Sequence, residues 1–364
     1  TLYGGIKSEI FYAKMRNYKS AIESSLFQDD ISVDVYNNLI DAVDESLDAL
    51  NKYIDIRKKY LNLEKMHMYD LYVPITSNFD MKITYEQAQE IILKALKPLG
   101  EEYLSIVKRA FSERWIDVYE NEGKQGGAYS WGSYDSSPYI LMSYKDDLNS
   151  LFTLIHELGH SMHSYYSRTN QEYLYSSYKI FVAEVASTLN ELLLVHYLLE
   201  NSTSKDEKIY LLNYYLEQFR TTVYRQTMFA EFEKITHERV EAKEPLTAKE
   251  FTDIYYKLNE KYYGKSCVVD EQIGLEWARI PHFYSNFYVY KYATGFSAAS
   301  ALSEKILNEG ESAVEKYLNF LKSGGSEYPL NQLRAAGIDM EKKESIEKAL
   351  GVFKELVEEL EREC

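Results

Sequence analysis

The stretch that decides the fold runs from Leu151 to Glu191 and reads LFTLIHELGHSMHSYYSRTNQEYLYSSYKIFVAEVASTLNE. Apolar residues recur at three- and four-residue spacing in its first part and again in IFVAEVASTLNE, which predicts two helices joined by a polar turn. Both helices carry ionisable residues among the apolar ones. Burial of such groups is costly unless each finds a partner, so the stretch predicts a site as well as a core.

The first helix places His156 and His160 four residues apart, so both imidazoles leave the same face and can converge on one ion. That donor set suits zinc, which prefers nitrogen ligands. Glu157 lies between them and completes the pattern His-Glu-x-x-His. This pattern is typical of zinc metalloproteases, in which the glutamate is the general base.

Two further residues of this helix call for explanation. Gly159 costs about 1 kcal/mol relative to alanine inside a helix, which predicts that something approaches closely there. His163 shares the face of the two histidines but lies roughly 10 Å along the axis from His156, too far to bind the same ion. We expect His163 to support the site or to belong to the core. The other histidines are expected to be structural: His67, His196 and His237.

The third ligand is expected to come from the second helix. Glu184 stands among apolar residues, where an unpaired carboxylate would be costly, and the polar turn can bring it back across the first helix. Three protein ligands leave a fourth position open for water. Glu191 lies seven residues further along the same face and is expected to accept a hydrogen bond from a ligand histidine.

A second cluster lies in IGLEWARIPHFYSNFYVYKYATGFSAAS, Ile273 to Ser300. Tyr284, Tyr288 and Tyr292 are spaced by four residues, which predicts a row of phenols on one helix face with His282 at its start. The row may be read as core packing, but each buried hydroxyl then needs a partner. As a functional site, it offers phenol and imidazole donors for the oxyanion of an attacked peptide carbonyl.

The charge and composition of the chain limit which partners it can bind. A net charge of −16 argues against a nucleic-acid partner, no stretch approaches the length of a membrane span, and the start resembles no signal peptide. Two cysteines, Cys267 and Cys364, make no disulfide framework, so a cytoplasmic location is expected. Most of the 35 tyrosines are expected to be core residues, while some could line a binding pocket. The sequence indicates no oligomeric state.

Helices dominate the rest of the chain. Helical spacing predicts paired helices from Phe11 to about Lys65, and Thr84 with Gln87 has the form of a capping box. Residues 66–83 are expected to form a short extended linker that ends in a turn. The segment Gly123 to Tyr144 breaks the pattern, and its end, YILMSY from Tyr139, predicts a strand of a small sheet. This strand is expected to be an edge that aligns an extended peptide.

These motifs together resemble one family. HELGHSMHSYYS, FVAEVASTLNE and IPHFYSNFYVYKYATGF, together with HMYDLYVPI and GGSEYPLNQLRAAGIDM, closely resemble the M3 family of zinc peptidases, oligoendopeptidase F type, which includes the thimet oligopeptidase and neurolysin group. The resemblance covers essentially the whole chain. Members of that family carry a further N-terminal helical region that this chain lacks, and one wall of the substrate channel is expected to be incomplete without it.

The resemblance implies a mainly α, zincin-like catalytic domain, with a small β-sheet beside the His-Glu-x-x-His helix and a substrate channel. It implies that His156, His160 and Glu184 hold one zinc ion per chain and that Glu157 is the base. Transition-state stabilisation is implied for His282, Tyr288 and perhaps Tyr292. The domain would span residues 1–364, in four parts: helices over 1–120, the sheet over 121–145, the zinc-site helices over 146–200 and the His/Tyr cluster within 201–364.

The function predicted is a zinc-dependent endopeptidase that hydrolyses internal bonds of short peptides. Two alternatives stay open. A metallocarboxypeptidase would need a cation for the terminal carboxylate of its substrate, and Arg279 and Arg334 are the candidates. A peptide-binding protein with a relict zinc site would have no use for the general base Glu157.

Overall fold

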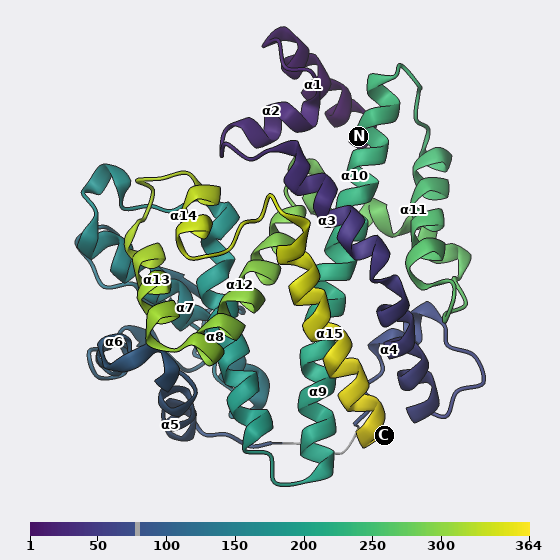
Figure 1. Cartoon of the computed structure of the whole chain (residues 1–364). Coiled ribbons are helices and arrows are strands. Elements are labelled where there is room, and N and C mark those ends of the chain that lie inside the picture. The colour runs from purple at the N-terminus through teal and green to yellow at the C-terminus, as the bar shows by residue number, and fades with distance from the viewer. Residues whose placement is uncertain (77–80) are drawn as a thin grey trace. The chain divides into compact units, whose positions relative to one another are not determined.

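The structure, a computed structural model, describes residues 1–76 and 81–364 (Figure 1). It confirms the mainly α class: helices make up most of the described residues, and one three-stranded sheet accompanies them. Of the extended linker predicted at residues 66–83, residues 77–80 lie outside the described residues, and the 3₁₀ turn Met68–Tyr72 interrupts the described part. The chain divides into two compact units of non-adjacent segments: unit 1 contains Thr1–Ser77, Leu212–Thr294 and Glu341–Cys364, and unit 2 contains Asn78–Leu211 and Gly295–Met340.

Unit 1 is helical throughout its regular structure. Its helices are α1 (Leu2–Met15), α2 (Ala21–Phe27), α3 (Val33–Glu45), α4 (Leu47–Tyr60), α10 (Arg225–Glu241), α11 (Ala248–Tyr263) and α15 (Lys343–Glu363), with 3₁₀ turns at Met68–Tyr72, Glu271–Arg279 and Pro281–Tyr284 and a π-helical turn at Arg220–Tyr224. The helices predicted between Phe11 and Lys65 are present. The last helix, α15, packs along α3 and α4 (Figure 1).

Tyrosines fill much of the core of unit 1. Tyr36, Tyr224 and Tyr255 are almost fully buried, and each hydroxyl has a partner. Tyr36 donates to the carbonyl of Ala230 at 2.7 Å, and Tyr255 donates to the carboxylate of Glu276 at 2.7 Å. A buried phenol with a bonded hydroxyl adds apolar area without an unpaired polar group. The abundance of tyrosine is thus explained here by packing.

Unit 2 holds the sheet and the two decisive helices. Its elements are α5 (Tyr85–Ala95), α6 (Gly100–Ser112), β1 (Ile116–Asp117), β2 (Tyr129–Trp131), β3 (Tyr139–Leu141), α7 (Leu148–Asn170), α8 (Ile180–Glu200), α13 (Glu311–Lys322) and α14 (Pro329–Ala335), with 3₁₀ turns at Lys97–Leu99 and Tyr173–Tyr175. The boundaries between the units fall inside α9 (Lys205–Phe219) and α12 (Tyr290–Glu309). The predicted capping box is present: Thr84 accepts from the Gln87 N–H, and Gln87 accepts from the Thr84 N–H.

Helix α7 begins at a side-chain cap, and α8 is largely buried. The Asp147 carboxylate accepts from the Ser150 N–H at 2.7 Å, which satisfies an N-terminal donor of α7. Apolar residues surround α8, as expected of a helix inside a core. By length and composition α8 could also span a membrane, although no such stretch was expected from the sequence. The most apolar window of α8 is 67% buried inside the protein, which fits the core assignment.

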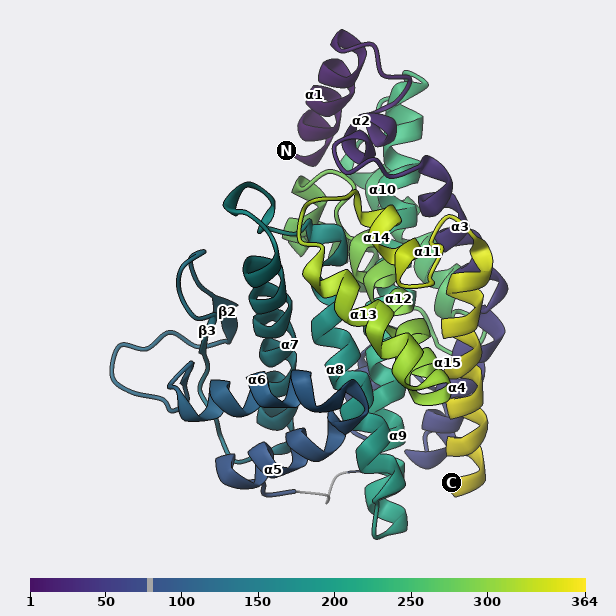
Figure 2. The same cartoon turned by 60° about the vertical axis from the view of Figure 1, so that its left-hand side comes forward.

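Gly159 sets the distance between α7 and α8, which lie side by side (Figure 2). A Cβ atom on Gly159 would lie 2.5 Å from the Cα of Ser187 and 2.6 Å from the carbonyl oxygen of Ala186. Real Cβ atoms do not approach backbone atoms so closely. The close approach predicted at Gly159 is therefore confirmed, and its partner is the backbone of α8.

The sheet differs from the prediction in two respects. Its strand order is β1-β3-β2, with β3 parallel to β1 and antiparallel to β2. The strand predicted in YILMSY exists as Tyr139–Leu141, but it is the central strand, so the prediction that it is an edge is wrong. The sheet also begins earlier than residue 121, because Ile116 and Asp117 pair with Ile140 and Leu141. An edge strand, β2, packs against α7.

Replacement of Gly159 by alanine is predicted to destabilise the protein, although alanine is the better helix former. Because the new methyl group meets backbone atoms of α8, the helices must separate, and overpacking of this kind typically costs about 1–3 kcal/mol. The free energy of unfolding in urea measures the effect. The matched control is Gly351→Ala in α15, whose Cβ would meet no atom within 4 Å and which should stabilise by about 0.5–1 kcal/mol. Equal stability of Gly159→Ala and the parent would contradict the close contact.

Candidate metal centre and aromatic cluster

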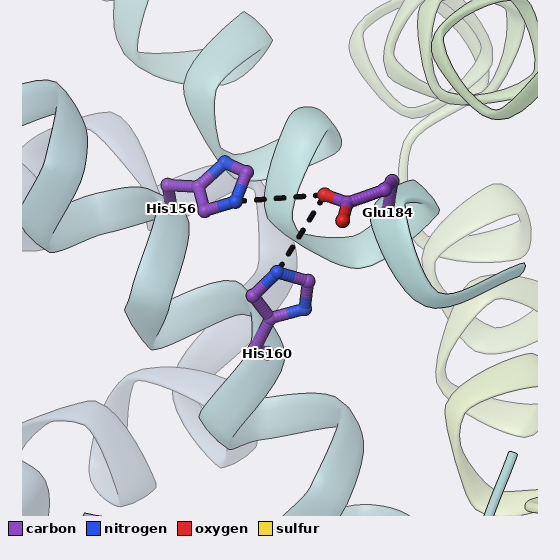
Figure 3. A group of neighbouring side chains, drawn as sticks. All are labelled: His156, His160 and Glu184. Atoms are coloured by element: carbon purple, nitrogen blue, oxygen red, sulfur yellow. Dashed lines mark ion pairs between the residues drawn. The ribbon is translucent and has the colours of Figure 1, made fainter. Parts of the chain in front are cut away.

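Three predicted ligands converge in unit 2 (Figure 3). The Nε2 atoms of His156 and His160 lie 3.5 and 3.6 Å from the same oxygen, Oε2 of Glu184. The two imidazole rings are 4.8 Å apart and nearly perpendicular, at 84°. Ligands about 2.0–2.1 Å from a tetrahedral zinc ion are separated by about 3.4 Å, so the donor set and its spacing fit zinc.

Hydrogen bonds also hold each of the three predicted ligands in place. The Nδ1 of His156 donates to the carboxylate of Glu191, which leaves Nε2 free to face Glu184. The ring of His160 hydrogen-bonds to the backbone of Ala183. The Ser187 hydroxyl donates to Glu184 Oε2 at 3.0 Å. Glu191 thus has the partner expected from the sequence.

The pKa values of the two histidines shift in opposite directions. Burial lowers the pKa of His156, but the hydrogen bond to Glu191 and the nearby carboxylates outweigh it and raise the pKa to about 9. Burial, with the charge on His156, lowers the pKa of His160 to about 4. The cluster therefore carries one positive charge among several carboxylates when no metal is bound. A divalent cation would replace that proton and balance the carboxylates better.

Glu157 is buried beside the cluster, with an exposed fraction of 7%. Burial raises the pKa of its carboxyl group, while the charge on His156 and the backbone of Ser130 in β2 act in the opposite direction. The side chain of Ser130 also contacts α7, through a hydrogen bond of 2.8 Å to Ser161. The carboxyl group is thus placed between the metal ligands and an edge strand, with a raised basicity that suits proton transfer.

The other histidines do not join the cluster. His163 is buried and stacks on Tyr178, with ring centroids 3.6 Å apart and planes at 2°. His67, His196 and His237 lie near carboxylates, those of Asp270 at 3.0 Å, Glu304 at 3.4 Å and Glu9 at 3.0 Å respectively. The interpretation of these histidines as structural fits these contacts. The stack on Tyr178 is a feature that the sequence did not indicate.

The aromatic cluster belongs to unit 1, and it is built by a loop and not by one helix face. His282 lies in the 3₁₀ turn Pro281–Tyr284, and α12 begins only at Tyr290, so the prediction of one continuous helical row is wrong. Tyr284 is exposed and its hydroxyl lies 3.0 Å from that of Thr1. Tyr284 therefore does not join the group.

His282, Tyr288 and Tyr292 nonetheless form one group. The ring centroids lie 6.1 Å apart for His282 and Tyr288, 6.0 Å for His282 and Tyr292, and 5.5 Å for the two tyrosines. The Tyr292 hydroxyl approaches the His282 Nε2 at 3.5 Å. His282 is exposed and the tyrosines are half-buried, so their polar atoms can meet a ligand. The predicted metal ligands belong to unit 2.

A strained residue holds this loop in place. Phe287 has a φ of +50°, which is rare for a bulky residue, and strain of this kind persists only where neighbours enforce it. Its N–H donates to the buried carboxyl of Glu233 at 3.1 Å, and its ring packs on Tyr36 and His237. Burial raises the pKa of Glu233 well above its usual value. The next residue is Tyr288, so the strained backbone lies directly beside that phenol.

The two arginines considered for a terminal carboxylate are both paired. Arg279 donates to Glu276, a carboxylate that also accepts from Arg225 at 2.6 Å. Arg334 lies 3.3 Å from Asp339. Each guanidinium thus has a carboxylate partner, although Arg279 shares Glu276 with Arg225.

Known proteins are similar to this chain along its whole length. The family description Peptidase family M3 matches residues 5–352. Oligopeptidase PepF of Bacillus subtilis is 53% identical over 361 residues, which cover 99% of this chain and 54% of that protein. Group B oligopeptidase PepB of Streptococcus agalactiae is 45% identical over 99% of this chain and 60% of that protein. The chain thus spans little more than half the length of these relatives.

Solved structures agree with the sequence comparison. The crystal structure of a putative peptidase from Chlamydophila abortus matches with a TM-score of 0.95 and 43% identity, over 100% of this chain and 61% of that one. Oligoendopeptidase-F from Enterococcus faecium matches with a TM-score of 0.78 and 42% identity, over 98% of this chain and 58% of that one. The resemblance seen in the sequence motifs is confirmed: the chain belongs to peptidase family M3 and is of the oligoendopeptidase F type.

Proposed function

We propose that the chain is the catalytic part of a zinc-dependent endopeptidase that cleaves short peptides internally. The observation that carries the proposal is the convergence of His156, His160 and Glu184 beside the buried Glu157. The similar proteins are named oligopeptidases and oligoendopeptidases, which supports short peptides as the substrate class. A cytoplasmic location, the absence of nucleic-acid and membrane partners, and one zinc ion per chain are parts of the same proposal.

Each residue of the cluster has a distinct task. His156, His160 and Glu184 would hold zinc, which when bound supplies Lewis-acid polarisation and lowers the pKa of water. Glu191 and the backbone of Ala183 orient the two imidazoles. Glu157 accepts the proton from the attacking water and then delivers it to the departing amine nitrogen. Its raised pKa suits both halves of this transfer.

His282, Tyr288 and Tyr292 are proposed to donate to the oxygen of the scissile carbonyl as negative charge develops there. Their support is the mutual packing of three polar rings with accessible donors, and the strained backbone that presents Tyr288. Donors held in advance of the reaction stabilise the transition state without reorganisation.

The strand proposed to align substrate is β2, since β3 is paired on both sides. It packs against α7, and its residue Ser130 interacts with Glu157 through the backbone. An extended peptide paired to its outer edge would be held by main-chain hydrogen bonds, which select shape more than side chain.

The similar proteins named oligoendopeptidases favour the endopeptidase over a metallocarboxypeptidase, which needs a cation for the terminal carboxylate; the exposed ion pairs of Arg279 and Arg334 do not decide between them. A quenched peptide blocked at both ends tests this choice. Internal cleavage supports the endopeptidase, and cleavage only of peptides with a free carboxyl end would favour the alternative. Absence of cleavage by a zinc-loaded protein would favour the peptide-binding alternative.

Glu157→Gln is predicted to retain zinc and to lose turnover. The substitution keeps the size of the side chain but removes the proton acceptor, and loss of a general base typically lowers kcat by about 10²–10⁴-fold. Zinc content by elemental analysis and kcat on the blocked peptide are measured on the same preparation. Activity within about tenfold of the parent would remove Glu157 from the base role.

Substitutions of Glu184 and Glu191 are expected to weaken zinc binding to different degrees. Glu184→Ala removes a ligand and should abolish tight zinc binding, whereas Glu191→Gln only weakens the support of His156 and should cost about 10–100-fold in affinity. Zinc affinity is measured by competition with a chelator. A full complement of zinc in Glu184→Ala would show that Glu184 is not a ligand.

Tyr288→Phe deletes one hydroxyl and preserves the ring packing with His282 and Tyr292. If the phenol donates to the oxyanion, kcat should fall by about 10²–10³-fold with little change in substrate binding. Tyr284→Phe is the matched control, since that phenol lies outside the group, and it should leave kcat unchanged. A normal kcat for Tyr288→Phe would mean that the group is structural.

A further inference from the structure

The segment between α7 and α8, residues 171–179, connects the two helices that carry the proposed metal ligands. It follows α7 directly and ends one residue before α8, whose first turns contain Glu184. Apart from one short 3₁₀ turn at Tyr173–Tyr175, this segment has no regular structure of its own. Its position must therefore be fixed by contacts with other parts of unit 2, and that position sets where α8 begins.

The turn Gly324–Gly325, just after α13, makes the tightest of these contacts. The N–H of Gly325 donates to the carbonyl of Tyr175 at 2.7 Å. Gly324 has a φ of +52°, and a Cβ on it would lie 2.4 Å from the Tyr175 carbonyl oxygen and 2.5 Å from the Ser167 hydroxyl. A Cβ on Gly325 would lie 2.4 Å from the carbonyl oxygen of Ser177. The segment thus rests directly on two residues that have no side chains.

Hydrogen bonds close the contact on both sides. The Gln171 side chain donates to the carbonyl of Lys322 at 2.9 Å, and the Gln332 side chain donates to the carbonyl of Gly324 at 2.6 Å. The Ser167 hydroxyl on α7 donates to the carbonyl of Ser176 at 2.6 Å. Ser167, Ser176, Gly324 and Gln332 are all buried, so these bonds are sheltered from water.

The end of the segment is held by the third histidine of α7. His163 stacks on Tyr178, whose hydroxyl lies 3.1 Å from that of Ser164. Phe320 of α13 covers the same imidazole, with ring centroids 5.3 Å apart. These contacts explain why a third histidine lies near the ligand pair without joining it.

We propose that the Gly324–Gly325 turn positions Glu184 for metal binding, by fixing the segment that leads into α8. This inference rests on the proposed zinc function, and it assigns a positioning role to residues that touch neither metal ligands nor substrate. A side chain at residue 324 would push the carbonyl of Tyr175 away and shift the start of α8. The Glu184 carboxylate would then move relative to His156 and His160, which stay on α7.

Gly324→Ala tests the proposal, with zinc affinity measured by chelator competition using zinc alone. Loss of outer support for a metal ligand typically weakens binding by about 10–100-fold, and we expect a loss of at least about tenfold here. Amide hydrogen exchange across residues 171–179 should also become faster. The control is Gly310→Ala: Gly310 also has a positive φ, +66°, but no atom lies within 4 Å of its Cβ position, so the substitution adds backbone strain without the contact. Gly310→Ala should bind zinc like the parent.

A milder variant, Ser167→Ala, removes only the hydrogen bond to Ser176 and decides the question if Gly324→Ala does not fold. It should weaken zinc binding by several-fold, and unchanged affinity would overturn the inference. Equal zinc affinity of folded Gly324→Ala and Gly310→Ala would overturn it as well. If the parent itself binds no zinc, the proposed function fails, and the inference fails with it.

Discussion

The close contact of α7 and α8 at Gly159 is the constraint on which the metal centre depends. Backbone meets backbone there, and the missing side chain allows Ser187 and Ala186 to reach the surface of α7. Glu184 lies just one turn before Ser187, so the same approach that packs the helices brings its carboxylate to the imidazoles. The ligand geometry is consequently a product of helix packing. Mutual attraction of the ligands would be a weak organiser, because the surrounding carboxylates also repel one another.

The repulsion between these carboxylates affects the metal-free protein. Three carboxylates, Glu157, Glu184 and Glu191, act on the single charge of His156, whose pKa rises to about 9 despite burial. Buried groups of like charge are destabilising unless a cation offsets them. The fold supplies one proton where a divalent ion would supply two charges. A site of this kind is therefore organised for a cation in advance of binding it, at some expense in the stability of the metal-free protein.

Local patterns in the sequence were sufficient to predict part of the fold and part of the site. Helical spacing located α7 and α8, a hydrogen-bond acceptor for one ligand histidine was inferred at Glu191, and Gly159 indicated a close neighbour. Strand order could not be inferred, since it depends on pairing Ile116 with Ile140 across the intervening chain. The left-handed backbone conformation of Phe287 could not be predicted either, because the residue at that position is neither glycine nor asparagine. The two-unit division was likewise not predictable, since each unit is assembled from distant segments.

The discontinuous course of the chain has a consequence for its synthesis. Unit 2 is complete once Met340 has been made, whereas unit 1 still lacks Glu341–Cys364. Those residues contain α15, which packs along α3 and α4. The apolar faces of α3 and α4 therefore stay uncovered until α15 has been made. Closing so long a loop between these segments is entropically costly and slow. The segments of unit 2 are therefore all present before α15, which the core of unit 1 needs, has been made.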